Sequence, residues 1–118
     1  MSGLTFNVKT ALNSAEIKAD LEATTRQVQA PLDALVLQDS NFFCPIKTGA
    51  LQKSAITNSR IGSGELVWRT PYARRLYYEY EKPAHQANPN ACAKWFEAAK
   101  ARWLDKWVRF INERIERS

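Results

Sequence analysis

The segment 91–117 places the strongest constraint on how this chain can fold. Its large apolar side chains recur every three or four residues, so a helix would gather them on one broad face. Three of the four tryptophans belong to this face, and a surface that wide has to be covered by the rest of the domain or by a neighbouring subunit. We predict a helix over about 91–116 that buries Trp95, Phe96, Trp103 and Trp107.

A second long helix is predicted over about 14–42. The apolar side chains of this segment fall on one face at helical spacing. Pro31 lies inside it, so we expect a kink or a break there. Ahead of the helix, residues 4–9 alternate between apolar and polar side chains, which indicates a short strand.

The middle of the chain predicts a β-hairpin. Residues 55–61 and 65–70 both look extended, and the glycine-containing turn 62–64 separates them. Trp68 lies in the second strand and is expected in the core. A short helix that begins at Thr48 is predicted just before the hairpin.

These elements define an α+β fold. A small antiparallel sheet, made of the hairpin at about 55–70 plus neighbouring strands, packs with the two long helices. A chain of 118 residues suits a single domain that spans residues 1–118.

Residues 71–80 (PYARRLYYEY) are the most unusual stretch, because four tyrosines and two adjacent arginines are crowded together. A proline at the first position suits a short helix, whereas the alternation of tyrosine and glutamate at 78–81 suits a strand. The pattern does not decide between the two. The segment that follows, 82–90 (KPAHQANPN), predicts a loop.

The positive charge is confined to the second half of the chain. Residues 1–59 hold five basic and five acidic side chains, whereas residues 60–118 hold twelve basic and seven acidic ones, which accounts for the net charge of +5. Ten of the thirteen aromatic residues also lie in the second half. This composition suits either nucleic-acid binding or an assembly surface.

Three interpretations of residues 68–80 stay open. The arginines and tyrosines could form the centre of a protein interface, the tyrosines could fill the core, or the arginines could bind phosphates while a tyrosine stacks on a base. Glu79 and Glu81 would weaken a phosphate-binding track. The candidate contact residues, which include two lysines from the segment 41–54, are Lys47, Lys53, Arg69, Tyr72, Arg74, Arg75, Tyr77 and Tyr78.

The sequence offers little for catalysis. Its single histidine, His85, has no Cys/His cluster nearby, and no phosphate-binding loop or nucleophile motif is present. We expect no enzyme activity, no metal and no cofactor, and we expect Cys44 and Cys92 to be free thiols. Because no apolar run reaches the length of a membrane span and no signal-peptide core opens the chain, we expect no membrane partner and a start in the cytoplasm.

Three motifs carry a family resemblance in their order and spacing. Residues 43–54 (FCPIKTGALQKS) are similar to the pattern aromatic-Val-Pro-x-Asp-Thr-Gly-x-Leu-x-x-Ser. Residues 68–78 (WRTPYARRLYY) are similar to Trp-x-Thr-Pro-Tyr-Ala-Arg-x-x-Tyr-Tyr, the most specific of the three, and residues 95–100 (WFEAAK) are similar to a Trp-Phe-Glu-x-Ala-Lys helix. Over roughly residues 30–110 the chain thus resembles the minor capsid or neck proteins of tailed bacteriophages, a family linked to tail-completion proteins. Lys47 departs from the pattern, which has an acid there.

The resemblance implies a structural role. Such proteins are small α+β subunits that join into a homo-oligomeric ring at the head–tail junction, between the connector below the portal and the tail tube. The resemblance implies other connector and tail proteins as partners. It also allows non-specific contact with packaged DNA. The implied place is the virion neck or tail, after assembly in the host cytoplasm. The alternative that the residues leave open is a small basic nucleic-acid-binding module.

Overall fold

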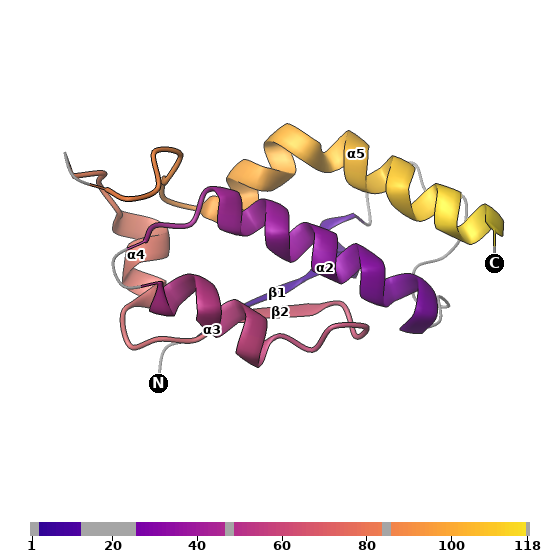
Figure 1. Ribbon diagram of the computed structural model, residues 1–118, viewed down its shortest axis with the longest axis horizontal. Coiled ribbons are helices and arrows are strands. Elements are labelled where there is room, and N and C mark those ends of the chain that lie inside the picture. The colour runs from indigo at the N-terminus through magenta and orange to yellow at the C-terminus, as the bar shows by residue number, and fades with distance from the viewer. Residues whose placement is uncertain (1–2, 13–25, 47–48, 84–85, 118) are drawn as a thin grey trace.

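The structure, a computed structural model, confirms the α+β class and describes residues 3–12, 26–46, 49–83 and 86–117. The molecule is elongated, with extents of 45 × 26 × 19 Å (Figure 1). In chain order, its elements are β1 (Leu4–Asn7), α1 (Val8–Ala11), α2 (Arg26–Phe42), α3 (Ala50–Asn58), β2 (Glu65–Trp68), α4 (Ala73–Glu79) and α5 (Trp95–Arg117).

The two long helices, α2 and α5, lie side by side and run in opposite directions (Figure 1). The predicted C-terminal helix is confirmed, and α2 confirms the second half of the predicted helix over 14–42. Residues 13–25 of that prediction lie outside the described residues. The helix does not break at Pro31, because Val28, Leu32 and Val36 on either side of it are buried in the core and hold the segment against its neighbours.

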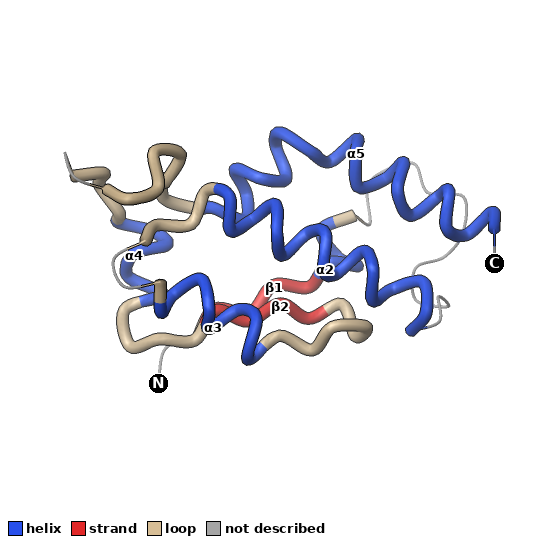
Figure 2. Tube along the Cα trace, in the orientation of Figure 1, coloured by secondary structure: helices blue, strands red, loops and turns tan. Residues whose placement is uncertain are grey.

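The sheet has two strands within the described residues, and its pairing differs from the predicted hairpin. Figure 2 shows β1 and β2 as two red segments that lie side by side. They are antiparallel, with Leu4 opposite Trp68 and Asn7 opposite Glu65, so the partner of β2 is the N-terminal strand. The predicted strand over 4–9 ends early, because the Asn7 side chain accepts a hydrogen bond from the Thr10 backbone N–H (3.1 Å) and thereby caps α1.

The first arm of the predicted hairpin is helical over residues 55–58, so the prediction of a strand there is wrong. Of residues 59–61, Arg60 forms a single antiparallel bridge with Glu65, as the predicted hairpin would. Leu51 and Ala55 lie one helical turn apart and are both buried, which extends the short helix predicted from Thr48 as far as Asn58. Two serines then replace the missing strand at the free edge of β2. Ser59 Oγ accepts from Val67 N–H (2.8 Å), and Ser54 Oγ accepts from Arg69 N–H (3.0 Å).

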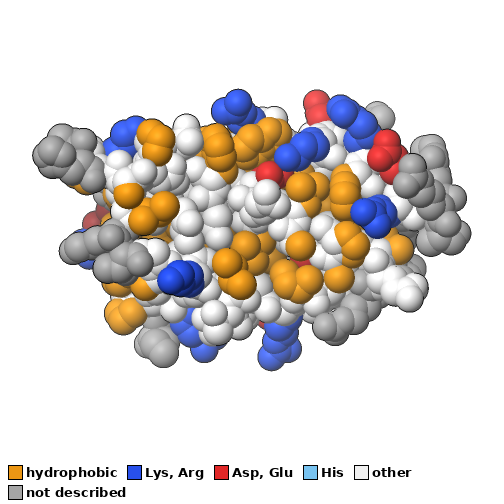
Figure 3. All heavy atoms as spheres, in the orientation of Figure 1, with side chains coloured by type: hydrophobic (Ala, Val, Ile, Leu, Met, Phe, Trp, Pro, Cys, Tyr) orange, Lys and Arg blue, Asp and Glu red, His pale blue; other side chains and the backbone are white. Residues whose placement is uncertain are grey.

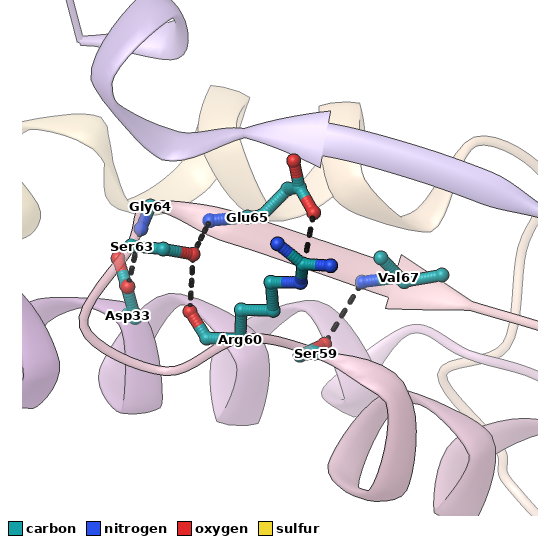
Figure 4. A network of polar contacts seen from close by, with 7 residues as sticks. All are labelled: Asp33, Ser59, Arg60, Ser63, Gly64, Glu65 and Val67. Atoms are coloured by element: carbon teal, nitrogen blue, oxygen red, sulfur yellow. Dashed lines mark hydrogen bonds and ion pairs between the residues drawn. The ribbon is translucent and has the colours of Figure 1, made fainter.

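The predicted glycine turn is present and is fastened to α2 by one carboxylate. Gly62 and Gly64 both have positive φ, at 102° and 87°. Their backbone N–H groups both donate to Asp33 Oδ2 at 2.8 Å, and Gln29 donates to the other oxygen. Figure 4 shows the bond between Gly64 and Asp33. Burial raises the pKa of Asp33, although the hydrogen bonds and Lys9 oppose that shift.

An aromatic core joins the sheet to α4 and α5. We use this name for Phe6, Trp68, Tyr77, Trp95 and Phe96. The rings of Phe6 and Phe96 stack at 4.5 Å, and Trp95 meets Tyr77 edge to face at 4.8 Å. Of the side chains predicted for the core, Trp68, Trp95 and Trp107 are fully buried, Phe96 is 5% exposed, and Trp103 is only half-buried.

Candidate interaction surface

Residues 73–79 form the short helix α4, which settles the choice between helix and strand for this segment. Ala73 and Tyr77 lie one turn apart and face the core, where both are fully buried. The opposite face carries Arg74, Arg75 and Tyr78, all exposed. The helix therefore presents an arginine–tyrosine surface at one end of the molecule (Figure 1).

Tyr77 is not a surface residue, which corrects its place among the candidate contacts. Its ring is fully buried in the aromatic core, 5.1 Å from Phe6. Its hydroxyl reaches the edge of the core and donates to Glu97 Oε1 at 2.7 Å. Burial first, and then this hydrogen bond, raise the pKa of Tyr77, because both favour the neutral hydroxyl.

The remaining candidates are spread over three segments. Lys53 is exposed on α3 and Arg69 is exposed just after β2. Tyr72 is half-buried at the start of α4. Lys47 lies outside the described residues. The structure thus places Arg74, Arg75 and Tyr78 on α4 with Tyr72 directly before it, whereas Lys53 lies on α3.

Beside α4 lies a groove of about 400 Å³. Apolar side chains dominate its walls, which come from α3, α4 and the loops after α2 and α4. Gln86 is the polar exception. The lining residues are Pro45, Ile46, Leu51, Tyr72, Leu76, Tyr80, Pro83, Gln86 and Ala87.

Two residues that the sequence interpretation treated as ordinary loop hold this groove together. Gln86 Oε1 accepts from Ile46 N–H (2.7 Å), while its amide nitrogen donates to the Tyr80 hydroxyl (2.7 Å). Asn88 is buried and donates to the backbone carbonyls of Phe42 (3.0 Å) and Cys44 (2.8 Å). Three of these four contacts join residues that are forty or more positions apart, so no local pattern could have revealed them.

One flank of α5 combines aromatic rings with cations, and we call it the aromatic–basic stripe. The Arg102 guanidinium carbon lies 5.1 Å from the centroid of the Trp103 ring and 6.0 Å from that of Phe42. Lys106 Nζ lies 4.8 Å from the Trp103 ring, and Arg114 lies 4.9 Å from Phe110. Figure 3 shows hydrophobic side chains next to basic ones over α5 and the adjoining part of α2. The stripe comprises Phe42, Arg102, Trp103, Lys106, Phe110 and Arg114.

The stripe is tied to the interior through Asp39. Its Oδ2 accepts from the buried Trp107 indole N–H at 2.7 Å and pairs with Lys106 Nζ at 2.8 Å. Asp39 itself is 8% exposed. One carboxylate on α2 therefore fixes both a core residue and a stripe residue of α5.

The described part of the chain holds no group of three or more residues suited to a metal ion. Cys44 is buried and Cys92 half-buried, and both are free. Burial raises the pKa of both thiols, which favours their neutral form. His85 lies outside the described residues. None of the helices described is both long and apolar enough to span a membrane.

The family model for "Minor capsid protein" matches residues 7–114 of this chain. The chain therefore belongs to this family of phage minor capsid proteins, and the family resemblance carried by the three motifs is confirmed. Members of the family are structural proteins of the virion. Comparison with curated proteins and with solved structures gives no match.

Proposed function

We propose that this protein is a single-domain structural subunit of the phage head–tail junction, where copies form a ring that joins the connector to the tail. Assembly would take place in the host cytoplasm before the subunit enters the neck of the virion. Membership in the minor capsid family supports the structural role. The order of the three motifs supports the position at the neck.

One observation carries the proposal further. Arg74, Arg75 and Tyr78 are exposed on a helix whose other face is locked into the core, so the backbone beneath them is rigid. Arginine and tyrosine on a rigid base are typical of residues that contribute most to binding between proteins. The groove beside α4 adds apolar area to the same end of the molecule.

The proposal is tested in the phage itself. In particles that carry the double substitution Arg74→Glu/Arg75→Glu, we expect filled heads and free tails to accumulate separately, as counted by electron microscopy of lysates. The matched control is Arg60→Glu/Arg109→Glu, which reverses two exposed charges that lie outside α4 and are not candidate contacts. Normal tailed particles with the α4 variant, or a labelled copy that lies in the shell and not at the neck, would contradict the proposal.

The alternative, a nucleic-acid-binding module, relies on the same exposed arginines. It predicts duplex DNA binding that weakens steeply with salt and is lost in Arg74→Ala/Arg75→Ala. Fluorescence anisotropy of a labelled duplex at low salt separates the two proposals. A subunit whose arginines contact protein has no need for such binding, so we expect no measurable dependence on these arginines.

A further inference from the structure

The aromatic–basic stripe contains cations that pair with no acidic side chain among the residues that the structure describes. Arg102 and Arg114 are exposed, and among the described residues neither forms an ion pair. Phe42, beneath Arg102, is 40% exposed. The stripe is thus an open surface on which apolar rings and free guanidinium groups alternate.

The ring contacts prepare these arginines to bind carboxylates. A guanidinium held over an aromatic ring keeps its N–H donors, which lie in its own plane, available for a two-bond contact with a carboxylate. Because the ring already restricts the long side chain, less conformational entropy is lost when a partner binds. The chemistry of the stripe therefore favours an acidic partner that also carries an apolar group.

This chain carries such a surface itself. Among the exposed or half-buried acids that the structure describes, Glu65 pairs with Arg60 and Glu97 accepts from Tyr77. Two more, Asp105 and Glu113, lie on α5 itself. The other two, at the end of α4, are unpaired in the described structure, and both are exposed; they are Glu79 and Glu81.

The end of α4 also supplies the apolar group. Tyr78, immediately before Glu79, is 56% exposed and is one of three large hydrophobic side chains that are exposed among the described residues. In one molecule, α4 lies at one end while α5 runs away from it to the opposite end (Figure 1). Arg114, near the far end of α5, therefore cannot be reached from α4 of the same copy.

We propose that the stripe of one copy binds the end of α4, with Tyr78, Glu79 and Glu81, of a second copy. The two surfaces differ, so the contact is head-to-tail and leaves each pair with one free surface of each kind. Such a contact closes into a ring when the rotation between copies allows it. The inference rests on the proposed ring, for which it supplies the surfaces in contact.

Charge reversal tests the contact in both directions. We expect Arg102→Glu/Arg114→Glu and Glu79→Lys/Glu81→Lys each to abolish self-association of the full chain in sedimentation velocity. An equimolar mixture of the two variants should regain the association of the wild type, because every contact in an alternating assembly then joins opposite charges. The variant Arg102→Lys/Arg114→Lys keeps the charge but loses the two-bond contact, so it should weaken the association less than charge reversal does. Thermal unfolding of each variant checks that it is folded.

Three outcomes would overturn the inference. The wild type could stay monomeric at about 1 mM, where a binding free energy of only about −4 kcal/mol would be visible. Either reversed variant could associate like the wild type, or the mixture could stay monomeric. Loss of duplex DNA binding in Arg102→Glu/Arg114→Glu, with a monomeric wild type, would assign the stripe to DNA. Electron microscopy of the phage measures the position of the protein in the virion separately. The proposed role at the head–tail junction can therefore hold even where the proposed contact between the stripe and α4 fails.

Discussion

The aromatic core and the aromatic–basic stripe use the same kinds of residue for opposite purposes. In the core, aromatic rings cover one another, as Phe6 does with Phe96 at 4.5 Å. In the stripe, cations lie over the rings: the centroid of the Trp103 ring is 5.1 Å from the Arg102 guanidinium carbon and 4.8 Å from Lys106 Nζ. Apart from the half-buried Phe6, the core is closed to solvent, whereas the stripe keeps charge and apolar area at the surface.

Neighbouring residues show how small a change separates the two regions. Tyr77 is fully buried and Tyr78 is 56% exposed, because successive helical positions differ by about 100° around the helix. Trp107 is fully buried, while Trp103, one turn earlier, is half-buried at the boundary. Residue type is therefore a poor guide to role here, and the angle around the helix decides it.

The largest expected contrast is between two tryptophans. Trp68→Ala should lower the free energy of unfolding by about 3–5 kcal/mol, because it opens a cavity in the closed core. Trp103→Ala should cost only about 1–2 kcal/mol, because that ring already meets water. Urea denaturation of both variants measures the difference. If both variants lost the same free energy of unfolding, Trp103 would belong to the core and not to a surface stripe.

A smaller effect is expected at Asp39, where the two regions join. Asp39→Ala should cost about 2–3 kcal/mol, because the buried Trp107 N–H loses its acceptor and Lys106 loses its partner. In a Trp107→Phe background the same substitution should cost less, by about 1 kcal/mol. A thermal-unfolding double-mutant cycle measures this coupling. Additive losses would mean that Asp39 does not link the core to the stripe.

The smallest effect is expected at the paired tyrosines, and it depends on pH. At pH 7, Tyr77→Phe should cost about 1 kcal/mol through the lost hydrogen bond to Glu97, and Tyr78→Phe close to nothing. The pKa of Tyr77 is raised in the folded state, so above pH 10 the unfolded chain releases this proton first. Above that pH, the free energy of unfolding of the wild type should fall as the pH rises. Its slope should be steeper than that of Tyr77→Phe by about 1.4 kcal/mol per pH unit. Parallel pH profiles would contradict this placement of Tyr77.

The sequence interpretation succeeded where a single element carries its own signal. The helical spacing of apolar residues in α5 and the turn at Gly62 and Gly64 were predicted and are present. The loop predicted over 82–90 is present in its described residues, 82–83 and 86–90. It failed where two distant segments could each pair with the same strand: residues 55–61 were predicted to pair with β2, but β1 does so. Residues 55–58 can be extended or helical, and β1 can pair with β2 only because the fold brings the N-terminus there.

The candidate surface divides in the same way. That arginines and tyrosines crowd residues 68–80 is plain from the sequence, yet only the packing of α4 shows which tyrosine is available. The stripe escaped prediction because Trp103 obeys the same period as Trp107, and a periodic pattern cannot mark the edge of a buried face. The contacts of Gln86 and Asn88 likewise join segments far apart in the chain.

By itself, the sequence determined the family, the two long helices and a positive second half without catalytic motifs, because composition, local periodicity and short motifs are properties of neighbouring residues. Tertiary structure alone decided that β2 pairs with the N-terminal strand, that Tyr77 is interior and Tyr78 exterior, and that cations cover the rings along α5. Those outcomes depend on which segments lie next to one another in the folded chain. Only these tertiary contacts determine which side chains are buried and which polar groups find a hydrogen-bond partner.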